Sequence, residues 1–332
     1  MAKGKLLPLE GIRALATIGI FLFHSGFLFQ GTFPVTLFFM LSGFLLYYTK
    51  EQYELGTFPQ WVRDYVAKKW RRFFPLHLLT FLGAVLLAWT ANKLTKEMIV
   101  PGVLNLLLIH PFFEEYALSF NGLSWFLAVT MFLYCVAFFL LRVIRKVQNV
   151  TFHIAFGLAV IVVLNLLLRM GASISLYTNP IYRMLDFWVG MLTAKAYLER
   201  QIEIKNATMV EFGLVGVFLV QYAASLFVGE KPGYYSILFT MALYVFAEGK
   251  GLLSKWLSTK IFRTIAYYSF EFYMVHEVVL RVFRRVFPDE SLPYLYRCAI
   301  IAAPSLAIAG FLAVIYKEVA AKIGEGNGKK HA

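Results

Sequence analysis

The segment that decides the fold is residues 12–29, which reads IRALATIGIFLFHSGFLF and is apolar apart from a few residues, notably Arg13 and His24. Its length suits a helix that crosses a bilayer. Arg13 and His24 are eleven residues apart. At about 100° and about 1.5 Å per residue, both side chains leave one stripe of the helix, about 16 Å apart along its axis. Ionisable groups inside a membrane are costly and usually functional, so this pair is the first candidate site.

The composition of the whole chain indicates a membrane protein. Of its 332 residues, 60% are hydrophobic and only 15% are charged. A soluble domain with these proportions would expose too much apolar surface. We therefore predict an all-α, polytopic bundle of membrane helices. Cys135 and Cys298 lie far apart in apolar segments, which predicts packing roles rather than a disulfide or a metal site.

Hydropathy predicts about ten transmembrane helices in one membrane domain, residues 1–320. A shorter apolar stretch from Val103 to Phe113 is too short to cross, and we expect it to be re-entrant or interfacial. Residues 321–332 are expected to form a disordered cytoplasmic tail. The first span has no cleavage site after it and is predicted to be retained. The ten predicted spans are 12–29, 34–49, 73–91, 122–141, 151–168, 182–198, 209–228, 234–247, 264–286 and 297–316.

The net charge of +13 is mostly an orientation signal rather than a nucleic-acid site. Most of the 32 lysines and arginines fall on one side of the predicted spans, so the positive-inside rule places both termini in the cytoplasm. One basic cluster is denser than orientation requires and could contact anionic lipids or a phosphorylated cytosolic ligand. No zinc-site spacing or phosphate-binding glycine loop is present in the sequence. The basic cluster consists of Lys68, Lys69, Arg71 and Arg72.

Six short motifs occur in order along residues 6–316. They are LEGIRALA (9–16) leading to His24, VTLFFMLSGFL (35–45), KKWRRFFP (68–75), SWFL (124–127), RMLDFWVGM (183–191) and SFEFYMVH (269–276). Each motif alone is weak, but the ordered series resembles the acyltransferase-3 family of bacterial integral-membrane O-acyltransferases. Two positions depart from the pattern. Thr130 stands where many members have glutamate, and Lys69 stands where many have arginine.

The resemblance implies an acyl-CoA-dependent O-acyltransferase of the bacterial cytoplasmic membrane that needs no metal. It would move an acyl group, usually acetyl, from cytosolic acetyl-CoA to a hydroxyl of an extracytoplasmic polysaccharide or lipid-linked oligosaccharide. His24 would act as a general base or as a covalent acyl relay. Arg13 and the basic cluster would bind the donor phosphates. Asp186 or Glu271 would orient His24. Asp186 could instead pair with Arg183 three residues earlier, and Glu271 could pair with a basic residue of a loop.

The acceptor is expected to contact four further residues on the outer side. Trp125 could stack on a sugar or anchor the helix at the interface. His276 could line the acceptor site or brace the bundle. His110 and Arg183 complete the predicted acceptor set. Ser42 and Gly43 are expected to permit close approach of two helices rather than to supply a nucleophile.

Two other classes of function fit parts of the sequence. A transporter or flippase for an anionic solute or a lipid-linked sugar would use Arg13, Asp186 and His276 along its pathway. Secondary transporters often contain inverted repeats, and the sequence shows none. A membrane glycosyltransferase would be expected to carry large polar outer loops, and the longest loop, 92–121, has few polar side chains.

Overall fold

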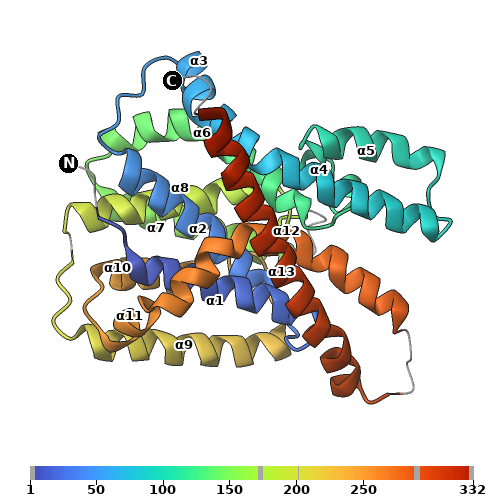
Figure 1. Cartoon of the computed structure of the whole chain (residues 1–332). Coiled ribbons are helices and arrows are strands. Elements are labelled where there is room, and N and C mark those ends of the chain that lie inside the picture. Colours follow the sequence, from blue (N-terminus) through green and yellow to red (C-terminus); the bar gives the residue numbers. More distant parts are fainter. Residues whose placement is uncertain (1–3, 171–174, 201, 288–291, 329–332) are drawn as a thin grey trace.

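The computed structural model describes residues 4–170, 175–200, 202–287 and 292–328, and within these residues it contains helices and no strands. The all-α prediction is confirmed. Figure 1 shows the long helix α13 lying across the bundle beside α12, with α4 and α5 projecting to one side. The main helices are α1 (Leu7–His24), α2 (Thr32–Lys50), α4 (Ala67–Thr90), α5 (Ile99–Leu106), α6 (Ser124–Lys146), α7 (Val150–Arg169), α8 (Pro180–Leu198), α9 (Ala207–Val228), α10 (Ser236–Glu248), α11 (Leu252–Leu257), α12 (Lys260–Val286) and α13 (Tyr294–Gly328).

Every predicted span coincides largely with one helix, but only some of these helices are apolar and long enough to cross a bilayer on their own. Among the described residues there are seven: α1, α2, the continuous segment Phe58–Thr90, α6, α7, α9 and α13. Helix α10 is short, and α8 and α12 carry several charged residues. The count of ten and the cytoplasmic termini therefore stay predictions. Helix α13 continues to Gly328, and residues 329–332 lie outside the described part of the chain.

The first helix is shifted relative to the predicted span. Helix α1 begins at Leu7, with Pro8 in its first turn, and ends at His24 rather than at Phe29. Proline is well tolerated in the first turn because no intrahelical N–H is lost there. Gly26 has a φ of 89°, which ends the helix in a conformation that favours glycine. His24 therefore lies at the C-terminal end of α1, where the chain turns toward α2.

Close contact between α2 and α8 forms the centre of the bundle. A Cβ atom at Gly43 would lie 2.0 Å from the carbonyl oxygen of Phe187, and one at Gly190 would lie 1.9 Å from that of Met40. Only glycine fits at either position, and the prediction that Gly43 permits close helix approach is confirmed. Fully buried Arg183 and Asp186 form an ion pair of 2.8 Å on the same α8 helix.

The apolar stretch that was expected not to cross forms short helices packed on α4 and α6. Buried polar side chains hold it there. His77 on α4 makes a 3.0 Å hydrogen bond to the carbonyl oxygen of Asn105, and Ser124 on α6 lies 3.3 Å from the ring of His110. All four residues are fully buried. The connection that follows this stretch, residues 114–123, supplies Leu118, Gly122 and Leu123 to the site described next.

Candidate active site

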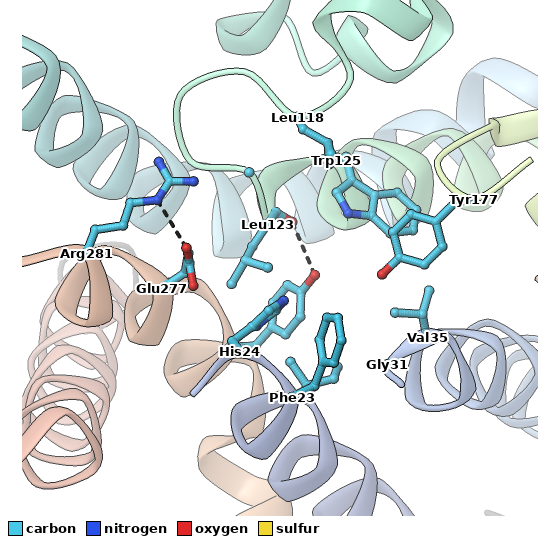
Figure 2. Close-up of a pocket in the computed structure, with 13 residues that line it drawn as sticks. Phe23, His24, Gly31, Val35, Leu118, Leu123, Trp125, Tyr177, Glu277 and Arg281 are labelled. Atoms are coloured by element: carbon cyan, nitrogen blue, oxygen red, sulfur yellow. Dashed lines mark hydrogen bonds and ion pairs between the residues drawn. The ribbon is translucent and has the colours of Figure 1, made fainter. Parts of the chain in front are cut away.

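His24 lines a cavity of about 240 Å³. We call it the aromatic cavity, because Phe23, Trp125, Tyr177 and Tyr273 also line it. Figure 2 shows Trp125 and Tyr177 on one side of it and the Glu277–Arg281 ion pair on another, with His24 between them. Trp125, which the sequence predicted to contact the acceptor, lines this cavity, and the contact itself stays a prediction. The lining residues are Ile20, Phe23, His24, Gly31, Val35, Leu118, Gly122, Leu123, Trp125, Tyr177, Tyr273, Glu277 and Arg281.

A second histidine holds the ring of His24. Nδ1 of His24 lies 2.9 Å from Nε2 of His276, and the two rings are stacked with centroids 5.2 Å apart. His276 is fully buried, and its Nδ1 lies 3.1 Å from the carbonyl oxygen of Phe272 on the same helix. The carbonyl of Phe272, the ring of His276 and the ring of His24 are thus linked by two successive hydrogen bonds, and His24 faces the cavity.

These two hydrogen bonds fix the position of each proton when both imidazoles are neutral. A carbonyl oxygen only accepts hydrogen bonds, so Nδ1–H of His276 donates to Phe272. Nε2 of His276 then carries a lone pair and accepts from Nδ1–H of His24. The lone pair of His24 is thereby left on Nε2, the nitrogen that makes no contact with His276. His24 is held in the tautomer that a base or nucleophile requires.

The C-terminal half of α12 also fixes the surroundings of His24. One oxygen of Glu277 accepts from Nε of Arg281 at 3.1 Å and from Nη1 of Arg284 at 3.3 Å. Arg284 also donates to the backbone carbonyl of His24, the last residue of α1. A cation at a helix C-terminus stabilises its unpaired carbonyls. Arg281 in turn donates to the carbonyl of Phe120, which ties the 91–123 segment to the same helix.

Arg13 lines a different and larger cavity of about 560 Å³, which we call the cationic cavity. Five further basic residues line it, from the N-terminus, α4, α12 and α13, and Glu10 is the acidic residue among its lining. Such a concentration of positive charge suits a ligand with several phosphates. The six basic lining residues are Lys5, Arg13, Lys69, Arg72, Arg263 and Lys317.

The predicted basic cluster divides between this cavity and the protein surface. Lys69 and Arg72 line the cavity, whereas Lys68 and Arg71 are exposed and do not. On α4, the side chains of Lys69 and Arg72 leave one face of the helix, and those of Lys68 and Arg71 leave another. A contribution of Lys68 and Arg71 to ligand binding in the cavity is therefore not supported by their position. Arg263 and Lys317 were missed because neither has a sequence signal that links it to Arg13, more than 240 residues earlier.

The two acidic residues expected to orient His24 lie elsewhere. Asp186 contacts Arg183 at 2.8 Å and the hydroxyl of Ser236 at 3.4 Å. Glu271 contacts Lys317 at 3.0 Å. In each case a cation close by satisfies the buried carboxylate, and His24 is held by another imidazole instead. The local pair that the sequence offered as the alternative for Asp186 is the one that forms.

Three of the four predicted acceptor residues do not line the aromatic cavity. His276 is fully buried against the ring of His24, which corresponds to its predicted alternative as a brace within the bundle. His110 is fully buried against Ser124, where it holds the 91–123 segment in place. Arg183 is also fully buried and lies behind the cavity wall. Its guanidinium stands 5.9 Å from the ring centroid of Trp125 and 5.4 Å from that of Tyr177. Arg183 thus supports two aromatic walls and has no direct access to the cavity.

Comparison with known proteins identifies the family of this chain. The family model for the acyltransferase domain of the acyltransferase-3 type matches residues 7–316, nearly the whole chain. The protein is therefore a membrane acyltransferase, and it belongs to the acyltransferase-3 family. It is 26% identical over 304 residues to acyltransferase MdmB of Streptomyces mycarofaciens, an alignment that covers 84% of this chain and 76% of that relative. No solved structure matches significantly.

Proposed function

We propose that the protein transfers an acyl group, most simply acetyl, from cytosolic acetyl-CoA to a hydroxyl of an extracytoplasmic polysaccharide or lipid-linked oligosaccharide. The observation that carries this proposal is that α1 contributes to two cavities of different chemistry. Arg13 lines the cationic cavity, and His24 lines the aromatic cavity. A donor with a polyphosphate head and a long arm could bind in the first cavity and present its thioester near the second.

The charge distribution supports the orientation. The loops rich in lysine and arginine would face the cytosol, where acyl-CoA is available. The cationic cavity includes Lys5 near the N-terminus and Lys317 near the C-terminus, both on this side in the predicted topology. The aromatic cavity would open toward the outer side, where a sugar could stack on Trp125 or Tyr177.

The proposed reaction starts with proton transfer to His24. Nε2 of His24 takes the proton of the acceptor hydroxyl, and the hydroxyl oxygen attacks the thioester carbonyl. The C–O bond forms as the C–S bond breaks, and the departing CoA thiolate receives the proton from His24. Alternatively, Nε2 attacks the thioester carbonyl, the C–S bond breaks and CoA leaves as the thiolate. The acceptor hydroxyl oxygen then attacks the acyl-imidazole, the bond between Nε2 and the acyl carbon breaks, and the hydroxyl proton passes to the CoA thiolate. His276 stabilises the reacting tautomer in both routes.

The experiment uses the purified full-length protein in liposomes with radiolabelled acetyl-CoA and methyl β-D-glucoside as a surrogate acceptor. We expect His24→Ala to lower the rate of thioester loss by about 10² to 10⁴, the usual contribution of a general base. His153→Ala is the control, since His153 lines neither cavity. If His24→Ala consumes acetyl-CoA at the wild-type rate, the role of His24 is wrong. If the wild type does not bind acetyl-CoA, the donor is wrong.

A further inference from the structure

The aromatic and cationic cavities meet at one side chain. Tyr273 lines both cavities, and no other described residue is shared by their linings. Its side chain is almost fully buried, with 6% exposure. Tyr273 stands on α12 one helical turn before His276, so it lies on the same face of the helix as the residue that holds His24.

The phenol ring of Tyr273 is held by contacts on both sides of this boundary. Its centroid lies 5.2 Å from that of Phe126, which lines the cationic cavity, and 5.9 Å from that of His276. Its hydroxyl donates to the carbonyl oxygen of Leu123, in the wall of the aromatic cavity, at 3.3 Å. This hydrogen bond is long for an O–H donor, so ring packing contributes most to its position.

The location of this ring matters for the acyl group in particular. The proposed donor binds by its phosphates among the cations around Arg13, about 16 Å along α1 from His24. Its thioester end must therefore reach the boundary between the two cavities. Any carbon atoms beyond the acyl carbonyl then compete for space with the phenol ring of Tyr273.

We propose that Tyr273 forms the partition between the donor and acceptor cavities and restricts the transferred acyl group to a short chain. This inference rests on the proposed function, because it assigns a specificity to that same site. Removing the ring would join the two cavities and provide room for a longer chain. Removing only the hydroxyl would leave the partition in place.

The test measures thiol release by the purified full-length protein from acetyl-, butyryl- and octanoyl-CoA in the presence of the surrogate sugar acceptor. We expect the wild type and Tyr273→Phe to prefer acetyl-CoA. We expect Tyr273→Leu and Tyr273→Ala to raise kcat/KM for butyryl-CoA relative to acetyl-CoA at least tenfold. Tyr197→Ala is the matched control, because Tyr197 lines neither cavity, and its ratio should equal that of the wild type. The thermal unfolding midpoint of each variant identifies those that fold.

The possible outcomes separate this inference from the proposed function. A wild type that releases no thiol from any of the three donors overturns the proposed function, and this inference falls with it. A wild type that is active on acetyl-CoA, with an unchanged ratio in folded Tyr273→Leu, overturns the partition alone. A folded Tyr273→Leu that is inactive toward all three donors also overturns it, since a selectivity residue would leave the reaction intact. A wild type that uses all three donors with equal kcat/KM also overturns the partition.

Discussion

Replacing His276 by leucine tests the role of the histidine pair most sharply. Leucine fills a fully buried position but cannot accept the hydrogen bond that Nε2 of His276 receives at 2.9 Å from Nδ1 of His24. A buried donor left without a partner costs about 1–3 kcal/mol. His24 would also be free to adopt the other tautomer, which places the proton on Nε2.

The expected loss follows from these energies. At about 1.36 kcal/mol per tenfold change in rate, kcat for thioester cleavage should fall by about 5- to 150-fold in His276→Leu. The dissociation constant for acetyl-CoA should stay at its wild-type value, because His276 does not line the cationic cavity. His276→Gln keeps an oxygen that can accept from His24 and should retain more of the wild-type kcat than His276→Leu.

The assay determines kcat from thiol release and the dissociation constant from equilibrium titration with acetyl-CoA. The thermal unfolding midpoint confirms that each variant is folded. A folded His276→Leu protein with the wild-type kcat would refute the argument from the tautomer. So would a loss that appears only as weaker binding of acetyl-CoA.

Three further predictions concern the cationic cavity and the core. Arg72→Ala should raise KM for acetyl-CoA about tenfold or more, because charge-assisted hydrogen bonds contribute about 1.5–3 kcal/mol. Arg71→Ala should leave KM unchanged, and equal effects of the two variants on KM would contradict the division of the basic cluster. Arg183→Leu or Asp186→Leu alone should lower the free energy of unfolding by about 3–5 kcal/mol, and the double variant should lose less than either, as a denaturation series would show. Gly190→Leu should lower the yield and the thermal unfolding midpoint, because a Cβ atom at position 190 would lie 1.9 Å from the carbonyl oxygen of Met40. A variant that unfolds at the wild-type midpoint would disprove the close contact of α2 with α8.

Features that depend on local sequence were predictable. Apolar length located the helices, and the periodicity of α1 placed Arg13 and His24 on one stripe. The pairing of Asp186 with Arg183 was also available locally, because three residues on a helix bring two side chains together. The end of α1 at His24 was not predicted, since the apolar run continues to Phe29 and only the φ of Gly26 shows the turn.

Features that depend on packing between distant helices were not predictable. His24 and His276 are 252 residues apart, and nothing in either segment indicates that their rings stack. Lys317 reaches the same cavity as Arg13 only because α13 lies against α12. Asp186 and Glu271, which the sequence suggested as partners of His24, are each paired with a cation instead. Which partner a carboxylate finds depends on proximity in three dimensions.

The most direct test of the central claim compares Arg13→Ala with His24→Ala in two measurements on the same samples, acetyl-CoA affinity by calorimetry and thioester cleavage by thiol release. Because the two side chains line separate cavities, we expect Arg13→Ala to weaken binding of acetyl-CoA. We expect His24→Ala to bind acetyl-CoA with wild-type affinity and to fail to cleave it. If His24→Ala binds poorly and Arg13→Ala binds normally, or if His24→Ala cleaves at the wild-type rate, the assignment of donor binding and chemistry to opposite parts of α1 is contradicted.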